Sequence, residues 1–523
     1  MAFIHFFGLM FAPFNVSILM LGVVGGLILG ATPGVSPTLA VALLIPFTFK
    51  MAPTASLILL GSVYSAAMAG GAISAILINV PGAPANIATL FDGHKMSLKG
   101  RAMEGLHYAM LASGIGGVVG VLVLIFLAPA LGKMAMQFGP SQMFWVAILG
   151  ITVMGAVGSG SMVKGLLSGA IGVWISCIGY SDTYGVERYV FSPVLSGGVS
   201  LVGALIGLFA IPEVLKLLSD SKKPGGGAMY ALEPRRVVSS LKALPKYWRT
   251  LSIGSFIGCF IGVIPGAGGQ VAGLVSYDQC RKFSPFRDNY GSGEPDGVIA
   301  SESANNATAG PALVPLLTLG VPGSPTAAVL LGGLLINGLF PGPELFVKSG
   351  NVVWTFIDSL LVAQILMAVL GLYLARISRR VAQIPKRFMS VSVLILAVYG
   401  TYSIRNNFDD VIVMIGIGVM MYYLEKVGLS AGPMVLGIIL GPIAETNWEQ
   451  GKMIADATHG VLPYFFTGGL NLMMISFCCA SVGYSIFIEV RMRKKRRVAS
   501  GHKKQIEKMK AAERQTSRFE LPD

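Results

Sequence analysis

The sequence predicts an all-α polytopic membrane protein made of two inverted repeats with broken helices. Three observations support this prediction: the apolar composition, a pair of proline-glycine breaks that recurs along the chain, and the distribution of basic residues between loops. The chain of 523 residues is 54% hydrophobic and only 12% charged, and its mean hydropathy is +0.70. Since soluble domains carry about 25% charged residues, the composition excludes an ordinary soluble domain.

Apolar stretches that approach the length of a membrane span occur throughout the chain. They lie at 14–31, 54–79, 106–132, 142–158, 165–180, 193–212, 351–375, 389–402, 411–424, 428–443 and 464–489. A full span needs about 20 residues, so the shorter stretches suit half-helices or re-entrant hairpins, and we expect about 10–14 transmembrane or re-entrant helical segments. Asp409, Asp410 and the stretch from Glu445 to Glu449 are predicted to lie in loops.

Two proline-glycine breaks interrupt each half of the chain in the same order. Pro33-Gly34 is echoed 232 residues later by Pro265-Gly266, and Pro81-Gly82 is echoed 241 residues later by Pro322-Gly323. At membrane depth such a break survives only where protein or a water-filled cavity surrounds it. One break alone is explained as a kink between packed helices, but four at matching positions favour a transporter with a binding site between two repeats.

Basic residues mark the predicted cytoplasmic side and the borders of the repeats. They concentrate in the loop from Lys95 to Arg101, in a linker at 216–250, in the loop from Arg376 to Arg387, and in a tail at 490–523, where twelve Lys and Arg face four Asp and Glu. By the positive-inside rule these segments are cytoplasmic, including the C-terminus. We therefore expect a first transmembrane repeat at 1–215, a basic cytoplasmic linker at 216–250, a second transmembrane repeat at 251–489 and a basic cytoplasmic tail at 490–523.

The charge bias of the loops is reversed between the two halves. The loop after the second break holds Lys95, Lys99 and Arg101 in the first half but reaches only Lys348 in the second. The loop before that break holds one lysine at 47–53 but three basic residues at 278–290. This reversal predicts that the halves face opposite ways, as inverted repeats around a midplane site do.

The helix starts after the second break of each half are the predicted anion site. A new helix start offers unpaired backbone N–H groups and the positive end of its dipole, and neutral side chains can add further donors. The predicted substrate-binding residues are Pro81, Gly82, Asn86 and Thr89 in the first half and Pro322, Gly323, Ser324 and Thr326 in the second. Donors of this kind suit a carboxylate.

A polar run from Gly293 to Gly310 leads directly into an apolar segment and is the predicted cation site. Neutral oxygens are hard ligands for a small cation, and a carboxylate can balance its charge or carry a proton. The predicted ion-binding residues are Gly34, Ser36, Asn79, Gly266, Ser303, Asn305, Asn306 and Thr308, and the charge or proton candidates are Glu302, Asp296 and Asp358. Two alternatives stay open: Asn305 and Asn306 capping a helix with Glu302 in its first turn, and an interfacial position for Asp358.

Enzyme and metal signatures are lacking in the sequence. The five cysteines and five histidines have no metal-ligand spacing, and there is no Walker pattern, nucleophile elbow or His/Glu metal pair. We therefore expect no enzyme activity, no metal and no cofactor beyond a coupling ion, sodium or proton. The charge of +14 is concentrated in the tail, which favours a bilayer surface over a nucleic acid partner.

Several motifs together resemble the large membrane subunit of the tripartite tricarboxylate transporter family, over nearly all of residues 15–490. The motifs are Gly30-x-x-Pro33-Gly34, Gly70-Gly71 with Asn79-x-Pro81-Gly82, Ala88-Thr89-x-x-Asp92-Gly93, Pro265-Gly266-x-Gly268, Glu302-x-Ala304-Asn305-Asn306-Ala307, and Leu319-Gly320-x-Pro322-Gly323 with Pro341-Gly342-Pro343. The resemblance implies a secondary transporter of the bacterial inner membrane that works with a small membrane subunit and a periplasmic solute-binding protein. It would import an organic carboxylate by symport with sodium or protons.

A different class of function competes with this hypothesis. The chain could instead be a passive channel, or a scaffold subunit whose partner holds the transport site. A carrier saturates and shows counterflow, whereas a pore conducts without saturation. A scaffold has no need for costly buried polar groups, so the polar run from Gly293 to Gly310 favours a carrier.

Overall fold

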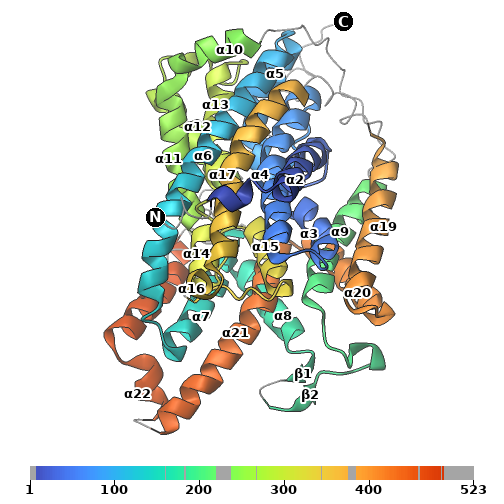
Figure 1. The fold of residues 1–523 in the computed structure, drawn as a ribbon, viewed down its shortest axis with the longest axis vertical. Coiled ribbons are helices and arrows are strands. Elements are labelled where there is room, and N and C mark those ends of the chain that lie inside the picture. The colour runs from blue at the N-terminus through green and yellow to red at the C-terminus, as the bar shows by residue number, and fades with distance from the viewer. Residues whose placement is uncertain are drawn as a thin grey trace, which may run out of the picture.

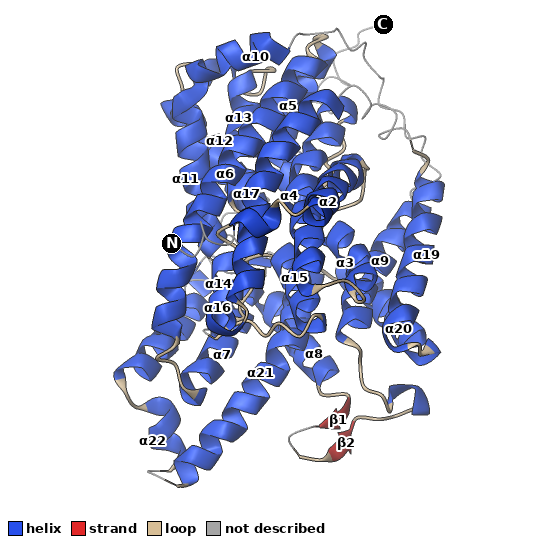
Figure 2. Cartoon of the chain, viewed as in Figure 1, coloured by secondary structure: helices blue, strands red, loops and turns tan. Residues whose placement is uncertain are grey.

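The protein is almost entirely helical, as its sequence predicts (Figure 2). The computed structural model describes residues 7–158, 161–181, 184–219, 237–264, 266, 268–342, 344–374, 384–457, 460–483 and 486–487. Among these residues, six helices are long and apolar enough to cross a membrane, and five apolar helices are shorter. An all-α polytopic membrane protein is therefore confirmed. The predicted basic tail and residues 220–236 of the predicted linker lie outside the described residues.

The helices of the first half divide at the breaks. They are α2 (Pro13–Ala31), α3 (Pro37–Thr48), α4 (Pro53–Ile78), the 3-10 turn η1 (Pro84–Asn86), α5 (Ile87–Leu98), α6 (Ala102–Ala135), α7 (Pro140–Gly158), α8 (Met162–Ser176), the 3-10 turn η2 (Pro193–Leu195) and α9 (Leu201–Ser219). A short antiparallel hairpin of β1 (Gly179–Ser181) and β2 (Val186–Arg188) follows α8, with Tyr180 opposite Glu187. The break at Pro33 thus separates α2 from α3, and the break at Pro81 separates α4 from η1 and α5.

The described elements of the second half begin at Val237. Its elements are α10 (Val237–Ala243), η4 (Leu244–Tyr247), α11 (Trp248–Val263), α12 (Gly268–Phe283), η5 (Arg287–Asn289), α13 (Pro295–Ala307), α14 (Leu313–Leu319), α15 (Pro325–Ile336), α16 (Leu345–Lys348), α17 (Gly350–Leu374), α19 (Lys386–Arg405), α20 (Phe408–Lys426), α21 (Ala431–Asp456) and α22 (Val461–Phe466). A helix at Gly469–Gly483 ends the described chain. The break near Gly266 separates α11 from α12, and the break at Pro322 separates α14 from α15.

Corresponding elements of the halves exchange packing partners. Helix α6 packs on α13, and their counterparts in the other half, α17 and α4, pack on each other. In the same way, α8 lies along α21 and α20 lies along α9. Helix α3 meets α15, and α12 meets α5. In Figure 1, α10 lies at one end of the molecule and α22 with the β1–β2 hairpin lies at the other. This exchange of partners is what a two-fold relation between the halves requires. The inverted orientation itself stays a prediction.

Three local predictions need correction. The stretch from Glu445 to Glu449 lies inside α21, because the helix continues beyond its apolar stretch and Glu445 pairs there with Arg188. Asp409 and Asp410 form the acidic first turn of α20, where they face the positive helix end and Asn407 caps it. The apolar stretch at 193–212 is helical only from Leu201, since residues 193–195 form the turn η2.

Candidate substrate and ion site

Helices α3 and α15 begin directly after a break in each half, and both are capped by serine. The hydroxyl of Ser36 accepts a hydrogen bond from the backbone N–H of Leu39 at 3.2 Å, and Ser324 does the same for Ala327 at 3.1 Å. A proline follows each cap and fixes the backbone for the first helical turn. At these two breaks, the Ser-Pro sequence thus specifies where the new helix starts. Ser36, predicted to bind an ion, acts in this structure as a helix cap.

The helix starts from different halves meet inside the protein. The hydroxyls of Thr38 in α3 and Thr326 in α15 are 2.8 Å apart, and the hydroxyl of Tyr64 lies 3.3 Å from that of Ser324. The start of α12 joins them, because a Cβ on Gly268 would lie 3.9 Å from the Cβ of Ser324. All of these side chains are buried. Three helix N-termini therefore converge on one region.

The two breaks of each half are packed against each other. The N–H of Gly266 donates to the carbonyl oxygen of Gly323 at 2.9 Å, and a Cβ on Gly323 would lie 2.8 Å from the carbonyl oxygen of Gly262. In the first half, a Cβ on Gly82 would lie 2.5 Å from the carbonyl oxygen of Gly30. Only glycine permits this approach of one backbone to another, which explains why glycine follows proline at these breaks.

The helix starts border accessible surface. Asn79, which ends α4 in a left-handed conformation with φ of 58°, is exposed, and so are Pro84 before η1 and Gln270 in the first turn of α12. Asn86 and Thr326, which follow in the new helices, are buried inside the protein. An anion that reaches these loops meets backbone N–H groups at the positive ends of the new helices. At the break before α3 a carboxylate of the chain itself is close by, since a Cβ on Gly34 would lie 2.8 Å from Glu213 Oε1.

Glu302 is fully buried in α13 and is held by donors from the first half of the chain. Its Oε1 accepts hydrogen bonds from Asn86 Nδ2 at 3.1 Å and from the hydroxyl of Thr89, and its Oε2 accepts one from the hydroxyl of Ser113 at 3.1 Å. The side chain of Asn305 lies beside the same carboxylate. Asn86 and Thr89, predicted to bind substrate, are therefore directed at Glu302, and this carboxylate joins the two halves of the chain.

The amides next to Glu302 leave two oxygens without donors. Asn86 and Asn305 both direct Nδ2 at the carbonyl oxygen of Met68, at 3.3 and 3.4 Å. Neither amide Oδ1 has a hydrogen-bond partner in the described part of the chain, and both side chains are fully buried. An unpaired buried acceptor costs about 1–3 kcal/mol, so these oxygens mark a place where a ligand would be stabilised.

A second polar cluster lies next to the first but differs in chemistry. Asn306 Nδ2 donates to the carbonyl oxygen of Ser65 at 3.4 Å and to Gln364 Oε1 at 3.3 Å. Within the described ranges, Ser65 Oγ, Asn306 Oδ1 and the donor Gln364 Nε2 have no partner. A mixture of donor and acceptors suits a water molecule, which offers both.

The other predicted carboxylates lie apart from Glu302. Asp296 is six residues earlier in α13, about 9 Å along the helix, and accepts from the hydroxyls of Ser284 and, at 2.9 Å, Tyr290. Asp358 is fully buried in α17, and neither of its carboxylate oxygens has a partner among the residues described here. Burial within the protein does not set the depth of Asp358 in the membrane, so its predicted role and the interfacial alternative stay predictions.

The remaining predicted ion-binding residues make local contacts. Ser303 and Thr308 donate to carbonyl oxygens of their own helix, at 3.5 Å to Ala300 and 2.7 Å to Asn305. Gly34 and Gly266 adopt φ values of 87° and 82°, which glycine allows. Their contribution to an ion site stays a prediction.

Asp92 belongs to the Ala88-Thr89-x-x-Asp92-Gly93 motif but is not among the predicted site residues, and it joins the halves at another place. It is fully buried in the middle of α5, and it accepts hydrogen bonds from the backbone N–H groups of Gly291, Gly293 and Glu294 at 2.8–3.0 Å and from the hydroxyl of Tyr277 at 2.7 Å. Its place in that motif is the signal that the sequence offers.

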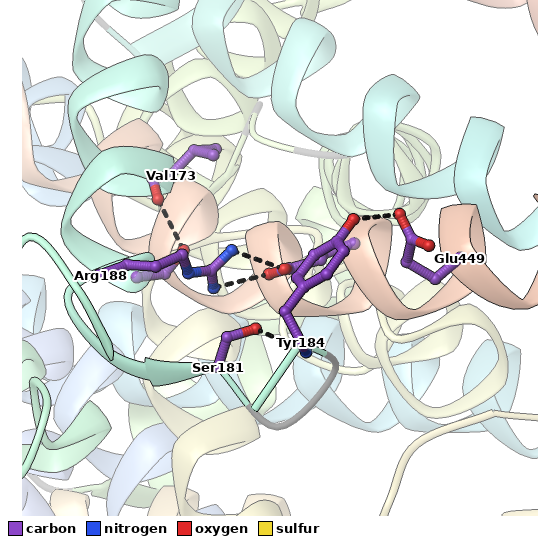
Figure 3. Close-up of polar contacts among 7 residues, drawn as sticks. Val173, Ser181, Tyr184, Arg188 and Glu449 are labelled. Atoms are coloured by element: carbon purple, nitrogen blue, oxygen red, sulfur yellow. Dashed lines mark hydrogen bonds and ion pairs between the residues drawn. The ribbon is translucent and has the colours of Figure 1, made fainter. Parts of the chain in front are cut away.

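The β1–β2 hairpin is tied to α21 outside this region (Figure 3). Arg188 donates two hydrogen bonds to Glu445, at 2.7 and 3.1 Å, and Tyr184 donates to Glu449. The hydrogen bond with Glu445 raises the pKa of the Arg188 guanidinium, so it stays charged. These contacts fix the hairpin over one end of the helices.

Comparison with known proteins gives consistent results. A sequence model described as the tripartite tricarboxylate transporter TctA family matches residues 16–436. An uncharacterized 52.8 kDa protein in the TAR-I ttuC' 3' region of Agrobacterium vitis is 31% identical over 486 residues, which cover 92% of this chain and 95% of that protein. A protein in the TAR-II ttuC' 3' region of the same organism is 36% identical over 203 residues, covering 38% of this chain and 84% of that protein. No solved structure matches the chain.

Proposed function

We propose that this chain, which belongs to the tripartite tricarboxylate transporter TctA family, is the subunit that carries an organic carboxylate through the bacterial inner membrane. Transport is driven by a sodium or proton gradient. A periplasmic solute-binding protein delivers the carboxylate, a small membrane subunit completes the complex, and the C-terminus is cytoplasmic. Membership of a transporter family rather than an enzyme family supports this proposal.

The observation that carries the proposal is the meeting of helix starts beside a buried carboxylate. Thr38 and Thr326 bring together helices that begin at breaks in opposite halves, and their N–H groups suit an anionic carboxylate. Neutral donors leave the charge of the substrate uncompensated. A cation bound at Glu302 neutralises this carboxylate and removes its repulsion of the anion, which links the movement of the anion to an ion gradient.

Uptake by proteoliposomes tests this function. The chain is reconstituted with the small membrane subunit and supplied with loaded binding protein, and an inward gradient of sodium or protons is imposed. We expect saturable accumulation and counterflow of the carboxylate. Uptake that persists unchanged after both gradients are collapsed contradicts the proposal and favours a passive channel, and absence of any transport by the complete complex favours a scaffold.

A further inference from the structure

We propose that Glu302, Asn86, Asn305 and the carbonyl oxygen of Met68 form a binding site for one Na⁺, and that the two amides turn over when the ion binds. The inference rests on the proposed function and deepens it, because it names the coupling ion and its ligands. It concerns a site that contains groups from both halves of the chain.

The spacing of the polar atoms fits a small hard cation. Asn86 Nδ2 lies 3.1 Å from Glu302 Oε1 and 3.3 Å from the carbonyl oxygen of Met68, and Asn305 Nδ2 lies 3.4 Å from the same carbonyl. Around a hard cation with ligands at about 2.4 Å, neighbouring oxygens of an octahedral shell are about 3.4 Å apart. The atoms of this cluster already have the separations of such a shell.

A half-turn of each amide converts the cluster into an oxygen cage. In the present arrangement both Nδ2 groups point at the shared acceptors, and both Oδ1 atoms point away without a described donor. Because the oxygen and nitrogen of an amide occupy nearly equivalent positions, rotation about the last side-chain bond exchanges them. Asn86 Oδ1 and Asn305 Oδ1 then join Met68 O and Glu302 Oε1 around one point.

Two glycines leave room for both amide orientations. A Cβ at Gly71 would overlap Asn86 Oδ1, and a Cβ at Gly269 would overlap Asn305 Oδ1. Each amide therefore has a glycine, not a larger residue, on the side that faces away from the carboxylate. Gly269 is the second residue of α12, which places the ion site next to a helix start of the proposed anion site.

The chemistry of the cluster selects a monovalent cation over a proton. A proton on Glu302 creates one O–H donor and can satisfy only one acceptor. A cation satisfies the carboxylate, the carbonyl and both amide oxygens at once. With a single carboxylate the occupied site is neutral for an ion of charge +1, whereas dedicated divalent sites such as EF-hands gather several carboxylates.

The neighbouring cluster of Ser65, Asn306 and Gln364 shows the contrasting case. Its unpartnered atoms include the donor Gln364 Nε2, which repels a cation. Ser65, Asn306 and Gln364 are all neutral, so this cluster has no carboxylate to balance the charge of a cation. The inference is therefore confined to the Glu302 cluster.

Equilibrium binding of ²²Na⁺ to the purified full-length chain in nanodiscs, without carboxylate or partner proteins, tests the site. We expect saturable binding that Li⁺ competes for and K⁺ does not. Asn86→Ala and Asn305→Ala each remove one oxygen ligand and weaken Na⁺ binding about tenfold or more. Asn337→Ala is the matched control, because this amide pairs with Ser56 and Gly333 elsewhere, and its Na⁺ affinity is expected to equal that of the unmodified chain.

Two results overturn the inference: no saturable Na⁺ binding by the unmodified chain, or unchanged affinity in Asn86→Ala and Asn305→Ala. Folding of each variant is checked by its elution as a single species of native size. Infrared difference spectra add a second readout, since Na⁺ should shift the amide bands of these asparagines without creating a carboxylic-acid band. Na⁺ binding without carboxylate transport contradicts the proposed function alone, and proton-driven transport without Na⁺ binding contradicts the ion site alone.

Discussion

Asp92 and Glu302 are both fully buried carboxylates that join the two halves, yet they are held by different kinds of donor. Asp92 accepts three hydrogen bonds from the backbone N–H groups of the loop before α13 and one from Tyr277. In the described part of the chain the donors to Glu302 are side chains, those of Asn86, Thr89 and Ser113, together with Asn305 beside them. The number of donors is similar, but their freedom to move is not.

The difference separates a structural contact from an exchangeable one. Backbone N–H groups keep their direction as long as the loop keeps its fold, so they cannot become ligands for a cation. A side-chain amide can rotate and present its oxygen instead. Asp92 is therefore suited to fix α5 against the second half, and Glu302 is suited to bind and release an ion.

Replacing Glu302 has the largest expected effect on transport. Glu302→Gln removes the only carboxylate of the proposed cage and leaves a cation uncompensated in a buried site. We expect the Na⁺ concentration for half-maximal uptake to rise about 100-fold, corresponding to about 3 kcal/mol. Initial uptake rates in proteoliposomes measure this, and an unchanged Na⁺ requirement would refute the role of Glu302.

Replacing Asp92 should affect stability instead of ion binding. Asp92→Asn weakens four hydrogen bonds to a charged acceptor, and we expect a loss of about 2–3 kcal/mol in the free energy of unfolding. Thermal unfolding in detergent measures the loss as a lower midpoint. The folded variant should bind Na⁺ as the unmodified chain does. Weaker Na⁺ binding would contradict the assignment of Asp92 to stability and Glu302 to ion binding.

At the helix starts, Thr326→Val should weaken carboxylate binding. The substitution removes the hydroxyl that pairs with Thr38 at 2.8 Å, and a lost hydrogen bond of about 1 kcal/mol raises the KM about fivefold. Thr318→Val is the control, since this buried hydroxyl donates only to the Val314 carbonyl of its own helix. Equal KM values for the two variants would contradict a role for this helix start.

The smallest effect is expected at the hairpin. Arg188→Gln removes a partly exposed ion pair with Glu445, and such pairs contribute about 1 kcal/mol or less. The raised pKa keeps Arg188 charged, so no pH dependence of the pair is expected from the arginine. Sodium dependence of uptake should be unaffected, and a large shift in it would show that the hairpin takes part in ion coupling.

The sequence predicted the elements that depend on local chemistry. Proline and glycine predicted the breaks and the new helix start after Pro322-Gly323, which is α15, whereas Ser36 was predicted to bind an ion and instead caps α3. The polar run at 293–310 identified Glu302 and Asn305 because polar residues beside an apolar segment are costly. What it missed depends on contacts between distant residues: Asn86 and Thr89 lie more than 200 residues before Glu302, and a sequence pattern carries no distance between them.

Binding of radiolabelled di- and tricarboxylates to the purified chain, with and without saturating Na⁺, tests the central claim most directly. A cation held between Glu302 and the helix start of α12 should strengthen carboxylate binding about tenfold or more, because coupling energies between sites are typically about 1–3 kcal/mol. The enhancement should disappear in Glu302→Gln. Carboxylate affinity that does not respond to Na⁺ in the unmodified chain, or that still responds in Glu302→Gln, would contradict the account.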